Sequence, residues 1–281
     1  MANKLILSAF ADEYSENFTE QLEALKKFDI SYLEIRGVDG KNISLLDKNE
    51  VKQIKQKLKD YDIKISSIGS PIGKIKIDGN IDEHLEMAKR VFETAEILDS
   101  KYCRIFSFYA PDGQDINNYK TQVYDYLERI VKIAENYNVT LCHENESLIY
   151  GESPEKCLEI MEYFGGKMKY VFDMANYVIE GYEPYPDAYQ KLIKHIEYFH
   201  IKDALYAGAI VPAGKGEGKI KEILDDWKKN GTHDVFITLE PHLQSFSGLN
   251  ALVGRPFVNP YQYANQKTAF TDAVKKLREL L

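Results

Sequence analysis

Polar side chains of metal-binding types stand at four points of the chain, each at the end of an apolar run. They are Glu144, Asp173, His200 and Glu240. A single acid at such a point more often caps a helix or pairs with a lysine. Four in the same phase predict one divalent ion, because like charges buried together need a cation or shared protons. Three carboxylates and one imidazole suit Mn²⁺, Mg²⁺, Co²⁺ or Zn²⁺, and ligand type alone does not choose among them.

The apolar runs that carry these residues belong to a repeat along the whole chain. Eight short runs rich in β-branched and aromatic residues are typical of strands, and amphipathic segments with helical spacing, such as Glu50–Tyr61 and Glu83–Leu98, lie between them. The expected strands are Leu5–Ala9, Tyr32–Arg36, Lys64–Ile68, Tyr102–Ser107, Val139–Glu144, Tyr170–Asp173, Tyr198–Lys202 and Val235–Glu240. This alternation predicts βαβ units and a parallel sheet. Asp82, and Ser153 before Pro154, are expected to cap helices.

The even repeat predicts the α/β class and a single (β/α)8 TIM barrel that spans residues 1–281. No linker rich in Ser, Gly or Pro divides the chain. A dinucleotide-binding sheet is disfavoured, because the turn after the first expected strand, residues 10–14, lacks the G-x-G-x-x-G pattern. In a barrel the chemistry lies at the carboxyl ends of the strands, so the four polar residues should converge on its axis.

Composition limits the binding partners and the cellular compartment that we expect for this protein. The net charge of −8 disfavours binding to nucleic acid or to an anionic membrane surface. Three cysteines without a Cys-x-x-Cys pair argue against a disulfide framework or a structural zinc site. The first apolar run is too short for a signal peptide, and no run reaches membrane-spanning length. We therefore expect a soluble cytoplasmic protein.

The order and spacing of these motifs resemble the sugar phosphate isomerase/epimerase family of the xylose-isomerase-like TIM barrel superfamily. The matching segments are residues 8–13 (SAFADE), 34–37 (EIRG), 143–146 (HENE), 173–176 (DMAN), 200–203 (HIKD) and Glu240. The resemblance implies a divalent metal held by Glu144, Asp173, His200 and Glu240. It also implies that the two glutamates act as acid and base.

The reaction that the resemblance implies is isomerisation or epimerisation of a sugar, a sugar phosphate or a related keto-polyol. One glutamate would remove the proton between two metal-bound oxygens, and the other would return a proton to a metal-stabilised cis-enediolate. A keto-polyol dehydratase of the inositol type would use the same site and then expel hydroxide. A noncatalytic sugar-binding barrel is a third reading, against which the paired glutamates argue.

The DNA-repair branch of the superfamily is disfavoured. That branch, like several epimerases of the superfamily, carries a histidine three residues after the sixth-strand aspartate, where this chain has Asn176. Asparagine can bond a sugar hydroxyl but is a poor metal ligand. Six histidines in all are few for a three-zinc cluster, and the charge of −8 repels DNA.

Further charged residues are candidate substrate contacts. Glu34 and Arg36 share one strand face, which fits a structural ion pair and substrate contacts equally well. Lys74 and Lys202 can place positive charge near the mouth, although lysines are more often solvated. Arg255 lies in a long connection after Glu240, which suits a sugar contact, a roof over the site or the interface of a homo-oligomer.

The glycine-rich segment 212–219 (PAGKGEGK) has the composition of a phosphate cradle. It lacks the G-x-x-x-x-G-K-[ST] pattern, however, and a flexible turn before the next helix is the stronger reading.

Overall fold

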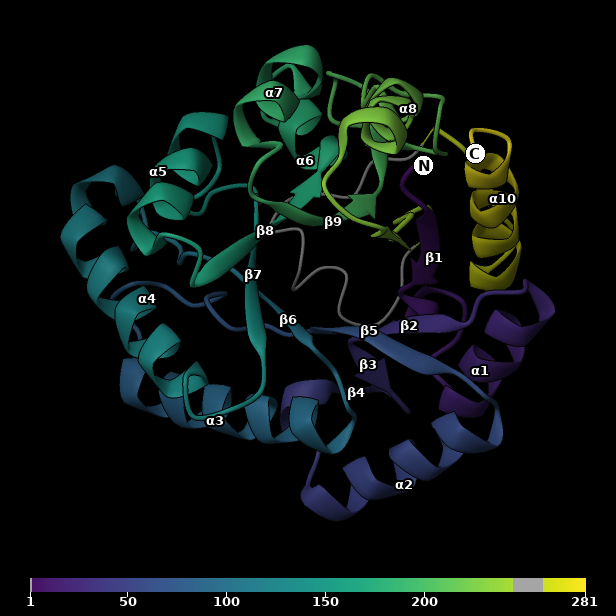
Figure 1. Cartoon of the computed structure of the whole chain (residues 1–281), viewed down its shortest axis with the longest axis horizontal. Helices are drawn as coiled ribbons and strands as arrows, with labels where there is room; N and C mark the ends of the chain where they lie inside the picture. The colour runs from purple at the N-terminus through teal and green to yellow at the C-terminus, as the bar shows by residue number, and fades with distance from the viewer. Residues whose placement is uncertain (1, 245–259) are drawn as a thin grey trace.

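Eight parallel strands close into one barrel in the computed structural model, which describes residues 2–244 and 260–281 (Figure 1). In order around the barrel the strands are β1 (Leu5–Ala9), β2 (Tyr32–Ile35), β5 (Lys64–Gly69), β6 (Tyr102–Ile105), β7 (Thr140–Glu144), β8 (Met168–Asp173), β9 (Ile196–Ile201) and β12 (Val235–Leu239). β12 pairs with β1 over the full length of both strands and closes the sheet. The predicted (β/α)8 barrel is confirmed.

Helices surround the barrel as an outer ring (Figure 1). They are α1 (Phe18–Lys27), α2 (Lys48–Asp60), α3 (Ile81–Ile97), α4 (Lys120–Ala134), α5 (Pro154–Phe164), α6 (Met174–Ile179), α7 (Tyr189–Leu192), α8 (Ile220–Asn230) and α10 (Gln266–Arg278). Their apolar faces pack on the outward side chains of the strands, as the spacing predicts. Within the described residues, no helix combines the length and the apolarity that crossing a bilayer requires.

Two helix starts test the expected caps. The Ser153 side chain accepts the N–H of Lys156 ahead of Pro154, so this cap is confirmed. The expectation for Asp82 is wrong, because the cap of α3 is Asn80, which accepts the N–H of Glu83. Asp82 is the second residue of the helix, in its first turn, where its negative charge is still close to the positive end of the helix dipole.

Two short hairpins extend the loops at the carboxyl ends of the strands. β3 (Gly37–Val38) and β4 (Lys41–Asn42) follow β2, while β10 (Asp203–Ala204) and β11 (Ile210–Val211) follow β9. The strand register matters more for chemistry, since β8 and β9 pair with Asp173 opposite His200. Side chains at the ends of neighbouring strands are thereby set at one level of the mouth.

The loop after β5 is fixed to α3 by one buried histidine. Gly73 has a φ of +86°, and a Cβ there would lie 2.1 Å from the carbonyl oxygen of Phe106, so only glycine fits. The Gly73 N–H donates to Nε2 of His84, at 2.8 Å. Burial lowers the pKa of His84 to about 4, so the folded protein keeps the ring neutral as an acceptor.

This histidine predicts an acid-sensitive part of the stability. The unfolded chain binds a proton at His84 near pH 6.5 and the folded chain only near pH 4. The stabilisation is therefore complete above pH 6.5 and is lost as the pH falls towards 4, by at most about 1.4 kcal/mol per pH unit. Urea unfolding of the wild type and of His84→Gln between pH 7.5 and 4.5 should show the wild type losing more free energy of unfolding. Parallel curves for the two proteins would contradict this assignment.

Candidate metal centre

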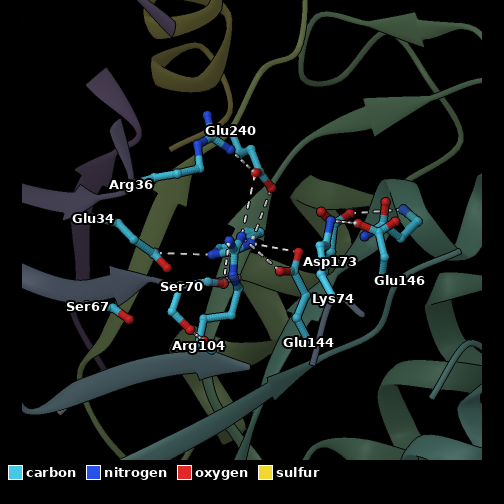
Figure 2. Close-up of polar contacts among 12 residues, drawn as sticks. Glu34, Arg36, Ser67, Ser70, Lys74, Arg104, Glu144, Glu146, Asp173 and Glu240 are labelled. Carbon is cyan, nitrogen blue, oxygen red and sulfur yellow. Dashed lines mark hydrogen bonds and ion pairs between the residues drawn. The ribbon is translucent and has the colours of Figure 1, made fainter. Parts of the chain in front are cut away.

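The four side chains expected to bind a metal meet at the mouth of the barrel. Figure 2 shows the three carboxylates among them, Glu144, Asp173 and Glu240. Glu144 and Asp173 end β7 and β8, His200 lies in β9, and Glu240 directly follows β12. One ligand atom from each lies within 4.8 Å of the others, and all four residues are buried. Residues up to 96 positions apart in sequence are brought together, because parallel strands end at the same side of the barrel.

His200 is oriented by a carboxylate beneath it. Its Nε2 lies 3.1 Å from Oε2 of Glu34, whose Oε1 accepts the hydroxyl of Tyr198 at 3.0 Å. The other ring nitrogen, Nδ1, faces Oε1 of Glu144 at 2.8 Å and Oε2 of Glu240 at 3.3 Å. A carboxylate on the far nitrogen of a histidine is the usual arrangement that fixes a metal-binding ring. Glu34 thus lies fully buried under His200.

Each glutamate of the cluster is held by its own arginine. Arg104 in β6 donates to Oε2 of Glu144 at 3.1 Å, and Arg36 donates to Oε1 of Glu240 at 2.8 Å. Both guanidinium groups lie over the ring of Phe10, with centroid distances of 5.4 and 4.2 Å. The sequence analysis did not select Arg104. Arg104 could have been found, because it is the one charged residue in an otherwise apolar strand. The alternation of strand faces that selected Glu34 and Arg36 would have applied to it as well.

Arg36 binds further acids from the loop after β1 rather than pairing with Glu34. It makes two contacts with Asp12, at 2.9 and 3.0 Å, and one with Glu13 at 3.2 Å. Burial raises the pKa of Glu13 to about 8, opposed by Arg36. In the sequence, Asp12 and Glu13 were noted as part of a turn without glycines and of the family-like segment 8–13, but not as site residues. Two adjacent acids directly after a strand were the signal that they face the mouth.

Two lysines complete the charge around the cluster. The Nζ atom of Lys202 lies 2.9 Å from Oδ2 of Asp173 and 3.8 Å from Oε2 of Glu240. Lys74 pairs with Glu146 at 2.8 Å, and Figure 2 places this pair beside Asp173. All of these side chains are largely buried, so the alternative of two solvated lysines does not hold, and both lie at the mouth. Burial raises the pKa of Asp173 to about 7, although Lys202 opposes that shift.

Asn176 braces the cluster through its backbone and its amide. Its N–H donates to Oδ1 of Asp173 at 2.9 Å, and its side chain donates to the carbonyl of Asn145 at 2.8 Å. The Asn145 amide in turn bonds the backbone of Asp173 on both its N–H and its carbonyl. These bonds fix the chain around Asp173. Arg255, the remaining expected contact, lies outside the described residues.

Charge counting supports a bound cation. Four permanently positive side chains face seven carboxyl groups in this part of the mouth. The cations are Arg36, Lys74, Arg104 and Lys202, and the acids are Asp12, Glu13, Glu34, Glu144, Glu146, Asp173 and Glu240. Even with protons on Glu13 and His200, whose pKa values are both raised, the carboxylates outnumber the positive groups, so the mouth keeps an excess of negative charge that a bound cation would balance.

Two oxygens of the cluster are also left for such an ion. Oδ2 of Asp173 and Oε2 of Glu240 are buried and have no partner with full hydrogen-bond geometry among the described residues; their nearest polar neighbours are Nζ of Lys202, at 2.9 and 3.8 Å, and Nδ1 of His200, 3.3 Å from Oε2 of Glu240. Buried carboxylate oxygens normally have such partners. Without an ion, the three surrounding glutamates raise the pKa of His200 against the effect of burial. The donor set and these two oxygens fit a divalent metal.

The glycine-rich segment binds a carboxylate of the chain itself. Oδ2 of Asp203 accepts the N–H groups of Gly214 and Gly216, at 2.8 and 2.9 Å, and Oδ1 accepts those of Gly218 and Ala204, at 2.9 and 3.0 Å. A Cβ on Gly216 would lie 2.4 Å from Oδ1 of Asp203. Three of the amides that could cradle a phosphate are therefore already used by Asp203. The segment forms a turn ahead of α8, as predicted, but one that is tied to Asp203 rather than flexible.

A closed parallel barrel with a buried cluster of three carboxylates and one histidine defines the class of protein. The family model for the xylose isomerase-like TIM barrel matches residues 22–279, so the chain belongs to this family. The resemblance inferred from the sequence is confirmed at that level. No curated protein matches the chain in sequence.

Solved structures share the fold at low sequence identity. D-psicose 3-epimerase from Clostridium cellulolyticum H10, solved with D-tagatose, has a TM-score of 0.74 and 14% identity and covers 100% of this chain and 98% of its own. The probable 3-DHS dehydratase AsbF from Bacillus anthracis has a TM-score of 0.71, 16% identity and 98% coverage of both chains. A xylose isomerase-like barrel from Mycobacterium smegmatis, solved with magnesium, has a TM-score of 0.70 and 12% identity and covers 99% of this chain and 96% of its own.

The Asp203 anchor gives a stability prediction. Asp203→Ala leaves four backbone N–H groups without their acceptor, so we expect the free energy of unfolding to fall by about 3 kcal/mol. The exposed Asp187 provides the control, and Asp187→Ala should change that energy by less than about 0.5 kcal/mol. Equal urea midpoints for the two variants would show that the loop does not depend on Asp203.

Proposed function

We propose that the chain is a divalent-metal-dependent isomerase or epimerase of a sugar or related keto-polyol, with Glu144 and Glu240 as its proton-transfer pair. One observation carries the proposal: the two buried glutamates reach the same cluster from strands across the mouth, each fixed by its own arginine (Figure 2). Acid and base groups held on two sides of one point can act on two faces of a bound substrate.

The glutamates would do the proton chemistry. One carboxylate takes the proton from the carbon next to a substrate carbonyl, and the other, protonated, gives one back. Return to the opposite face of the same carbon is epimerisation. Return to the former carbonyl carbon, with the hydroxyl proton of the first carbon passing to the former carbonyl oxygen, is isomerisation. Arg104 and Arg36 hold one oxygen of each carboxylate, so the second oxygen of each stays directed at the cluster.

A divalent ion held by Glu144, Asp173, His200 and Glu240 would supply a Lewis acid that stabilises negative charge on substrate oxygens. Lys202 lies beside Asp173 and Glu240, and its positive charge would also stabilise the negative charge on the substrate oxygens. Lys74, Asn176, Arg36 and Arg255 remain proposed substrate contacts. We assign Glu34 instead to the orientation of His200, since both of its oxygens are used there.

A keto-polyol dehydratase is the second candidate. A probable 3-DHS dehydratase and a D-psicose 3-epimerase both share the fold of this chain, so the fold is compatible with either reaction. Both reactions begin with the same proton removal. Loss of water from the substrate distinguishes the dehydratase.

Solvent deuterium exchange tests the proposal. The protein is incubated with Mn²⁺ in D₂O and a panel of ketoses, ketose phosphates and keto-inositols. We expect NMR to show deuterium incorporation at a carbon of at least one of these compounds. Glu144→Gln and Glu240→Gln should each slow that exchange by about 10²–10⁴-fold, because each removes one proton-transfer group.

A carboxylate outside the site provides the control. Glu197 in β9 is also largely buried and bonds Tyr102, so Glu197→Gln should leave the exchange rate unchanged. Full exchange in either Glu144→Gln or Glu240→Gln would contradict the roles of the pair. Retained sugar binding with no exchange in the wild type would favour the noncatalytic sugar-binding barrel.

A further inference from the structure

A second hollow lies on the rim of the barrel, beside the metal centre. We define the rim pocket as the space of about 670 Å³ lined by Lys76, residues 109–117, residues 148–150, Glu152, Ser153, Lys156 and Tyr182. Its walls come from the loops after β5, β6 and β7 and from the segment after α6. These loops all follow the carboxyl ends of strands, so the pocket opens on the face that carries the metal centre.

Two loops lead directly from the metal centre to this pocket. Lys74 and Glu146 pair beside Asp173, and the residues two positions further along the same loops, Lys76 and Leu148, line the pocket. Tyr109 lies between the two sites. Burial raises its pKa, and the charges of Glu146 and Glu144 raise it further, which puts the hydroxyl of this wall residue within their field.

The pocket wall is preformed by backbone hydrogen bonds. Tyr109 forms bridges with Lys76 on one side and Ile149 on the other. Its carbonyl accepts the N–H of Ile77 at 2.8 Å, and its N–H donates to Ile75 at 3.0 Å. The side chain of Ser107 accepts the N–H of Gly151 at 2.7 Å, which ties the third loop down. A preformed wall lowers the ordering cost of binding a ligand.

The lining mixes apolar surface with neutral polar groups. Tyr109 and Tyr182 are half-buried, and Leu148 is 53% exposed, so apolar surface faces the hollow. Gln114 and Asn117 are exposed amides on the same wall. A sugar ring has an apolar face and a rim of hydroxyls, and it matches such a lining.

The charges of the pocket disfavour a phosphate. Its two lysines already have partners, since Lys76 pairs with Asp112 at 2.7 Å and Lys156 with Glu159 at 3.4 Å. Three carboxylates, those of Asp112, Asp115 and Glu152, line the pocket against these two cations. An anionic group would thus meet net negative charge.

We propose that the rim pocket binds a second, uncharged sugar unit, so that the substrate is a glycoside or disaccharide rather than a phosphorylated monosaccharide. This inference rests on the proposed function for the ring that reaches the metal centre. The reacting sugar lies at the cluster, and the attached sugar lies past Lys74 and Glu146 against Tyr109.

Two adjacent asparagines provide a matched test. Asn117 lines the pocket, whereas Asn118 does not, and both are exposed. Maltose, cellobiose and lactose serve as probes beside glucose and glucose 6-phosphate, with binding measured by titration calorimetry and saturation-transfer NMR. At least one disaccharide should bind the wild type about tenfold more tightly than glucose or glucose 6-phosphate. Asn117→Trp should abolish this advantage by filling the pocket, and Asn118→Trp should retain it.

The outcomes separate this inference from the proposed function. If no disaccharide binds better than glucose, or if Asn117→Trp binds it as the wild type does, the pocket assignment is wrong even if a monosaccharide exchanges its proton. If disaccharide binding depends on Asn117 while no sugar exchanges a proton, the pocket assignment stands and the proposed function fails.

Discussion

Excess negative charge, buried at the carboxyl ends of the strands, is the constraint on which the arrangement of this barrel mouth depends. Glu144, Asp173 and Glu240 are brought within reach of one another by the closure of the sheet. Carboxylates removed from water repel each other strongly unless a cation or a proton lies between them. Every other group at the mouth can be understood by how it shares or balances that charge.

Some of the balancing groups orient the ligand side chains from outside the cluster, and others balance the charge at its centre. Arg36 and Arg104 lie over Phe10 and hold the outer oxygens of the two glutamates, while Glu34 holds the far nitrogen of His200 from below. These contacts set directions and leave the inner atoms facing one another. Lys202 balances part of the inner charge, and the negative charge that remains favours a bound cation.

The same charge logic argues for an uncharged attached group on the substrate. The only glycine-rich segment noted in the sequence is filled by Asp203, and the rim pocket carries more acids than bases. Positive side chains near the cluster, such as Lys74, are engaged by carboxylates of the chain. The described part of the mouth therefore matches the hydroxyl groups of an attached sugar better than it matches a phosphate group on the substrate.

The barrel and the positions of the four cluster residues could be predicted from the sequence, because strand ends and helix faces are local sequence patterns. Three buried acids and a histidine in phase were enough to locate the cluster on β7, β8, β9 and β12. The partners were harder to predict, since a pairing such as Arg104 with Glu144 depends on which strands are neighbours in space. The glycines after β11 illustrate the same limit: composition showed available amides, but only the fold showed that Asp203 reaches them first.

Metal titration tests the central claim most directly. Calorimetry of the metal-free protein with Mn²⁺ should give one ion per chain, and Asp173→Asn should weaken that binding at least tenfold, since it removes one of the four ligands. Glu146→Gln removes a buried carboxylate of the same region that is not in the cluster, and it should weaken binding only a few-fold. Absence of binding in the wild type, or equal weakening in the two variants, would show that the four side chains do not form a metal site.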